Sequence, residues 1–83
     1  MEVNFTNQEE LYSRIYPALH IMAQEVKKTT FIKIEEKDIW EYLKNNIWNN
    51  TVELSLSVMV EDVFDLDIKT FINYIIKKRQ DLL

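Results

Sequence analysis

The chain has 83 residues, of which 47% are hydrophobic and 12% aromatic, and its formal net charge is −4; this fits one small domain with its own core and argues against intrinsic disorder. The chain has no cysteine and no glycine and has a single proline, which excludes disulfides, thiolate zinc sites, P-loops and dinucleotide-binding fingerprints and argues against an all-β fold. The acid excess disfavours a broad non-specific surface for nucleic acids or anionic membranes, but it leaves room for a local basic patch.

The first predicted helix follows a capping box at residues 6–9, with Thr6 as the N-cap, and runs to about Lys28. The acidic, polar start fits neither a signal peptide nor a transit peptide, and no stretch has the roughly 18–20 apolar residues of a membrane span, so we expect a cytoplasmic protein. Pro17 lies opposite the apolar face, which favours one helix kinked at the proline; a break with a second helix starting there is the alternative. That apolar face comprises Leu11, Ile15, Leu19, Met22 and Val26.

Residues 29–34 are β-branched and alternate as a strand does, but no other segment offers a partner strand. We therefore predict an extended connector held to the core by Phe31, Ile32 and Ile34. The second helix begins near Glu35, where a good capping residue is missing, and ends in an asparagine-rich turn. Its predicted core residues are Ile39, Trp40, Leu43 and Ile47. For Trp48, which follows them, burial in the core and contact with a partner are equally open.

The third predicted helix starts at Asn50 or Thr51 and is apolar on two sides. One side carries Val52, Leu56, Met59, Val60 and Val63. Leu54 and Val58 lie on the other side among acids, which indicates a central helix or one exposed at an interface. Asp67 is expected to cap a fourth helix, whose apolar stripe comprises Ile68, Phe71, Ile72, Ile75, Ile76, Leu82 and Leu83. The patterns together predict an all-α, compact four-helix domain with an ordered core of about residues 6–80.

The sequence offers few groups for catalysis or metal binding. His20 is the only histidine, and we interpret it as an exposed structural residue because no partner that would orient a general base is evident. The acidic run at residues 61–67 lacks the glycine turn and the closing glutamate of a calcium loop, so helix ends and caps explain it better. We expect no enzymatic activity, no cofactor and no metal site.

Basic residues gather after the first helix and at the end of the fourth. They are Lys27, Lys28, Lys33, Lys77, Lys78 and Arg79. If these helix ends are adjacent, the residues form a patch that can grip a few phosphates; complementing the helix dipoles is the alternative. DNA reading is disfavoured, because the third helix, the natural recognition helix, carries acids and neither Lys nor Arg.

A series of short motifs runs through most of the chain, roughly from Leu11 to Ile76. The motifs are Tyr16-Pro17-Ala18-Leu19, Asp38-Ile39-Trp40-x-Tyr42-Leu43, Trp48, Leu56-x-x-Met59-Val60-x-Asp62 and Phe71-x-Asn73-Tyr74. This series resembles the ComN-like post-transcriptional regulators, small cytoplasmic proteins of low-GC Gram-positive bacteria. The resemblance implies a regulator that acts on messenger RNA, is linked in the family to competence for DNA uptake, and can work through protein partners. It identifies no residue that contacts RNA.

We therefore expect a small non-enzymatic regulator that works mainly through protein contacts, with Trp48, Leu54 and Val58 as partner-binding residues. The alternative is direct binding of RNA, or less favourably DNA, through the basic helix ends. The excess of acidic over basic residues favours action through a protein partner over direct RNA binding. Formation of a homodimer is also possible from the sequence.

Overall fold

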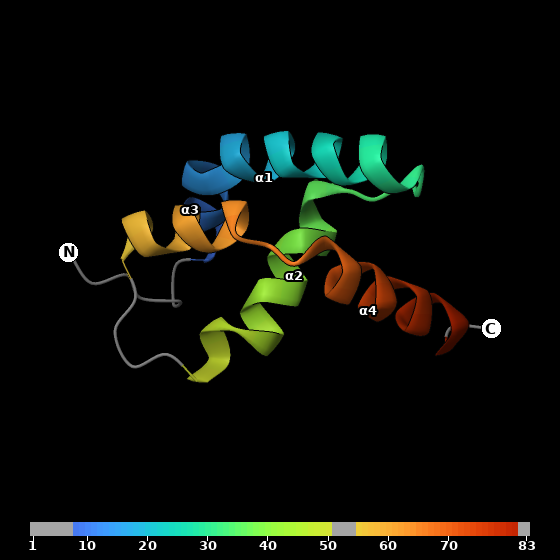
Figure 1. Ribbon diagram of the computed structural model, residues 1–83. Helices are drawn as coiled ribbons and strands as arrows, with labels where there is room; N and C mark the ends of the chain where they lie inside the picture. The colour runs from blue at the N-terminus through green and yellow to red at the C-terminus, as the bar shows by residue number, and fades with distance from the viewer. Residues whose placement is uncertain (1–7, 51–54, 82–83) are drawn as a thin grey trace.

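The computed structural model describes residues 8–50 and 55–81, and there the chain forms four α-helices, which confirms the predicted all-α class. They are α1 (Gln8–Thr30), α2 (Glu36–Asn46), α3 (Leu56–Phe64) and α4 (Ile68–Asp81), with a 3-10 turn, η2 (Trp48–Asn50), after α2. Figure 1 shows α1 lying across one side of the molecule, with α3 and α4 on either side of α2. Helix α2 packs against the other three helices, so it organises the core.

The first helix runs through Pro17 without a break, so the single-helix prediction is confirmed. Every member of its predicted apolar face is buried, from Leu11 to Val26. Pro17 and Ser13 are exposed on the opposite side, where water can reach the Ser13 carbonyl that the proline leaves without an amide donor. The predicted cap, Thr6, lies outside the described residues.

The connector covers residues 31–35 and not the predicted 29–34, because α1 continues to Thr30, and its predicted anchoring is only partly correct. Ile34 is buried and Ile32 packs against the core, whereas Phe31 is 90% exposed. Phe31 has a φ of 61°, and its amide donates to the Lys27 carbonyl at 2.8 Å. This is the left-handed ending that glycine usually provides for a helix. The reversal aims the phenylalanine ring at solvent, at a backbone cost of about 1–2 kcal/mol.

Helix α2 begins where predicted, with a better cap than the sequence suggested. The Asp38 carboxylate accepts a hydrogen bond from the Glu35 amide at 2.8 Å, as in a capping box. Ile39, Trp40 and Leu43 are buried as predicted.

The prediction that Ile47 belongs to the core is wrong, because it is 44% exposed. Helix α2 ends at Asn46, and the turn η2 then rotates the chain so that Trp48 faces inward instead. Trp48 is only 2% exposed. Its Nε1 donates to the Asp62 carboxylate at 2.8 Å, and its ring meets Trp40 edge to face at 5.7 Å. Burial leaves Trp48 no surface to offer a partner, so its assignment as a partner-binding residue is wrong and the core alternative is correct.

Helix α3 begins at Leu56, so the predicted start at Asn50 or Thr51 is wrong. Ser55 is the N-cap, and its hydroxyl oxygen accepts the Val58 amide at 3.2 Å. Met59 and Val63 are buried, while Leu56 and Val60 pack against the core. Val58, Glu61 and Asp65 are exposed, which confirms the two-sided pattern for this part of the helix. Val52 and Leu54 lie outside the described residues.

Helix α4 is capped as predicted, because the Asp67 carboxylate accepts both the amide and the hydroxyl of Thr70. Phe71, Ile72 and Ile75 are buried, whereas Ile76 is 43% exposed at the edge of the stripe. Ile68 packs against the core. The predicted contributions of residues 82–83 lie outside the described part of the chain.

The bond between Trp48 and Asp62 yields a stability prediction. We expect Trp48→Phe to lower the free energy of unfolding by about 2–3 kcal/mol, because it removes buried volume and a hydrogen bond to a charged acceptor. The matched variant Asp62→Asn keeps an oxygen acceptor and should cost less than about 1 kcal/mol. Urea denaturation of both variants measures the difference. Equal losses for the two would contradict this role of the indole.

A second prediction concerns the left-handed residue at the end of α1. We expect Phe31→Gly to raise the free energy of unfolding by about 1 kcal/mol, because glycine adopts this conformation without steric conflict. Phe31→Ala keeps the Cβ and should give no such gain. The same denaturation experiment compares the variants, and a loss of stability in Phe31→Gly would show that the exposed ring contributes to folding after all.

Candidate interaction site

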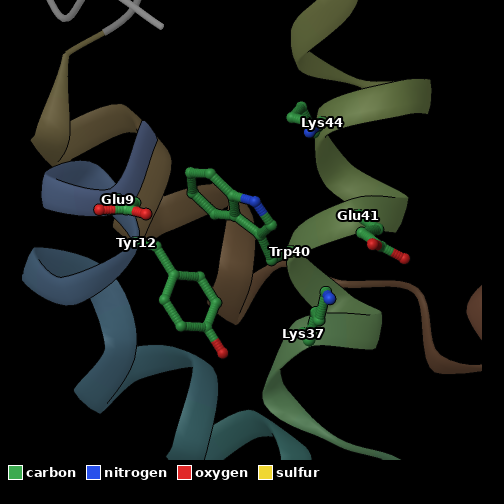
Figure 2. A pocket seen from close by; sticks show the side chains of 6 residues that line it. All are labelled: Glu9, Tyr12, Lys37, Trp40, Glu41 and Lys44. Carbon is green, nitrogen blue, oxygen red and sulfur yellow. The ribbon is translucent and has the colours of Figure 1, made fainter. Parts of the chain in front are cut away.

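A surface hollow of about 320 Å³ lies between α1 and α2. It is lined by Glu9, Tyr12, Lys37, Trp40, Glu41 and Lys44. Figure 2 shows the rings of Tyr12 and Trp40 between the two helices, with Glu9 on α1 and the lysines on α2. The α2 residues Lys37, Trp40 and Lys44 lie three and four positions apart, so they share one face of the helix. The hollow therefore combines an aromatic floor with charges of both signs.

The floor of the hollow is held by packing. Trp40 is 6% exposed, Tyr12 is partly buried, and their ring centroids are 5.4 Å apart at an interplanar angle of 83°. Burial, followed by the nearby Glu36 carboxylate, raises the pKa of the Tyr12 hydroxyl above its ordinary value. The Tyr12 hydroxyl is protonated at neutral pH, as tyrosines ordinarily are, and is able to donate a hydrogen bond to a ligand.

His20 joins α1 to the start of α2 beside this region. Its Nδ1 lies 2.7 Å from the Glu36 carboxylate, and its ring stacks on Tyr16 at 6.1 Å between centroids. The hydrogen bond from His20 is the main reason that the pKa of Glu36 is below its ordinary value. His20 is exposed, as predicted, but Glu36 is an orienting partner that the sequence did not reveal.

The end of α4 lies against the connector, so part of the predicted basic cluster does come together. Arg79 Nη2 donates to the Lys33 carbonyl at 2.6 Å. Lys78 Nζ instead pairs with the Glu41 carboxylate at 3.0 Å, and that bond raises the pKa of Lys78. The positive charge of Lys78 is therefore partly neutralised, while Lys77 is exposed on the same helix.

Lys27 and Lys28 line a separate open hollow of about 470 Å³ with Gln24 and Phe31. Both lysines are exposed on the last turns of α1. A nucleic-acid role for the basic residues stays a prediction. Among them, Lys27 and Lys28 line this second hollow together.

Among the predicted partner-binding residues, Val58 is placed on the surface. It is 40% exposed on α3, where Phe64 is also 47% exposed, and the exposed Glu61 lies between them on the helix. Trp48 is buried, and Leu54 lies outside the described residues. A partner contact at Val58 stays a prediction.

The sequence reasoning missed the hollow between α1 and α2 and the projection of Phe31. Trp40 was expected in the core, but its meeting with Tyr12 depends on how two helices cross. The available signal was the pair Lys37 and Lys44 flanking Trp40 on one face.

Within residues 8–50 and 55–81, no group of three acidic or histidine side chains is placed to hold a metal ion. No helix of this described part combines the length and apolarity needed to cross a bilayer.

Comparison with known proteins gives two matches. Residues 8–81 match a family described as post-transcriptional regulator. Over 66 residues, the chain is 29% identical to "Post-transcriptional regulator ComN" of Bacillus subtilis strain 168; the alignment covers 78% of this chain and 67% of that protein. No solved structure gives a significant match.

Proposed function

The chain belongs to the post-transcriptional regulator family, and from this premise we propose that it is a non-enzymatic cytoplasmic regulator that acts on messenger RNA mainly through contacts with a partner protein. The link to competence for DNA uptake is a further part of the proposal, drawn from the resemblance to ComN-like regulators. The hollow between α1 and α2 is the observation that carries the protein-contact mechanism.

The hollow combines the kinds of residue that are common in protein-binding sites. The partly buried Tyr12 ring, packed against the 6% exposed Trp40, provides an aromatic centre, and aromatic residues are enriched at the energetic centre of protein interfaces. Glu9 on one wall and Lys37 and Lys44 on the other provide a charged rim of mixed sign. Such a rim selects a partner segment whose own acids and bases are arranged to match it.

The exposed face of α3 is a second place for such a contact. Val58 and Phe64 expose apolar surface there, next to the acidic Glu61. Together with Leu54, Val58 remains the proposed partner-binding pair from the sequence, for another protein or for a second copy of the chain.

The protein-contact proposal is tested by reversing charge at the rim. We expect Lys37→Glu combined with Lys44→Glu to reduce partner recovery at least about tenfold, because like charges at a rim oppose a complementary surface. Tagged chains are purified from native cells after ribonuclease treatment, and co-purifying proteins are quantified by mass spectrometry. Lys69→Glu combined with Lys77→Glu makes the same charge change on exposed positions of α4.

The control pair should retain the partner, and circular dichroism should show unchanged helicity for both variants. If both variants recover the same proteins in equal amounts, the hollow is not the contact surface. If ribonuclease alone removes all specific partners, the main contact is with RNA and the adaptor mechanism is wrong.

A further inference from the structure

An aromatic ring projects from the end of α1 into solvent among polar groups. Phe31 is 90% exposed, and the hollow beside it is lined by Gln24, Lys27 and Lys28. Lys27 and Lys28 follow Gln24 by three and four positions, so both lysines neighbour it on the side of α1 that leads to the ring.

Hydrogen bonds fix the backbone that carries this ring. The Phe31 amide donates to the Lys27 carbonyl at 2.8 Å. On the preceding residue, the Thr30 hydroxyl donates to the Val26 carbonyl at 2.7 Å and accepts the Ile32 amide at 3.2 Å. Because Val26 and Ile34 are buried on either side, both ends of the reversal are fixed to the core. The backbone at Phe31 therefore has a well-defined conformation.

The surroundings of Phe31 distinguish between two kinds of occupant. The centre of a protein interface needs neighbouring apolar side chains that exclude water from the aromatic anchor. Besides Phe31, this hollow is lined by the methylene chains of Gln24, Lys27 and Lys28, which end in an amide and two ammonium groups. A single aromatic face beside cations is instead what an unpaired nucleotide requires, because the base stacks on the ring and the phosphates meet the cations.

We infer that the end of α1 is a binding site for single-stranded RNA. One base stacks on Phe31, the Gln24 amide hydrogen-bonds to the edge of that base, and Lys27 and Lys28 contact the adjacent phosphates. This contact goes beyond the protein-mediated function proposed above and uses different residues, so either proposal can fail without the other.

The electrostatics of the site are consistent with phosphate binding, although a helix C-terminus carries partial negative charge. Two of its terminal carbonyls, those of Val26 and Lys27, already accept hydrogen bonds, and the two lysines add full positive charges. Beyond the ring, Arg79 binds the backbone carbonyl of the exposed Lys33. These two side chains extend the positive potential along the path of a bound strand.

The test is a fluorescence anisotropy titration with a labelled single-stranded RNA of mixed sequence, about 12 nucleotides long, at about 50 mM salt. Wild-type protein should bind, and Phe31→Ala should weaken binding at least about fivefold through loss of one stacked base. Phe31→Tyr keeps a ring and should retain the affinity. Ile21→Ala is the matched control, because it removes another exposed apolar side chain from α1.

The salt dependence tests the lysines separately. Two phosphate contacts on a single strand predict a slope of about −1.4 in a plot of log affinity against log salt concentration. Lys27→Gln combined with Lys28→Gln should remove this contribution and leave only that of Lys33 and Arg79, while Lys69→Gln, at an exposed lysine outside the predicted basic patch, should leave the slope unchanged.

The inference is overturned if the wild type does not bind this RNA, if wild type and Phe31→Ala bind it equally, or if Ile21→Ala loses as much affinity as Phe31→Ala. Binding of a polyglutamate peptide with the same dependence on Phe31 would also overturn it, because the ring would then serve an acidic protein.

Discussion

The burial of the Trp48 indole is the interaction on which the arrangement of the chain depends. Its N–H reaches the Asp62 carboxylate on α3, and its ring meets Trp40 on α2, which in turn meets Tyr12 on α1. The Trp48 side chain thus contacts α2 and α3 directly and is linked to α1 through the Trp40 ring. The same packing fixes the floor of the surface hollow, because Trp40 and Tyr12 present their remaining edges there. The core and the hollow between α1 and α2 therefore share the aromatic side chains of Tyr12 and Trp40.

Helix α1 separates the two proposed contacts. Tyr12 contributes to the hollow near its start, and Lys28 and Phe31 stand at its end. Lys28 follows Tyr12 by sixteen positions, which span about 24 Å of helix, so a protein segment and a short RNA strand can be bound at the same time. This arrangement suits an adaptor that brings a partner to a transcript. The phenylalanine that we assign to RNA occupies a position where glycine would end the helix at a lower energetic cost.

The sequence predicted the helices well because their apolar residues repeat at helical spacing, as they do from Leu11 to Val26 and from Phe71 to Ile75. It could not decide between core and surface for Trp48, because that depends on where α2 ends and on one turn of 3-10 helix. Phe31 was wrongly expected to be buried, since a hydrophobic side chain gives no sign of the left-handed backbone that turns it outward. The hollow itself needs the crossing of α1 and α2, which single-helix periodicity does not contain.

The most direct test of this account is ultraviolet crosslinking of the tagged protein to RNA in native cells, followed by trypsin digestion and mass spectrometry of nucleotide-bearing peptides. We expect the tryptic peptide spanning residues 29–33, TTFIK, to carry the main crosslink, because the Phe31 ring stacks on a base. Protein partners should co-purify independently of that crosslink. Crosslinks confined to peptides of α2 or α3, or recovery of the protein without crosslinked RNA, would contradict it.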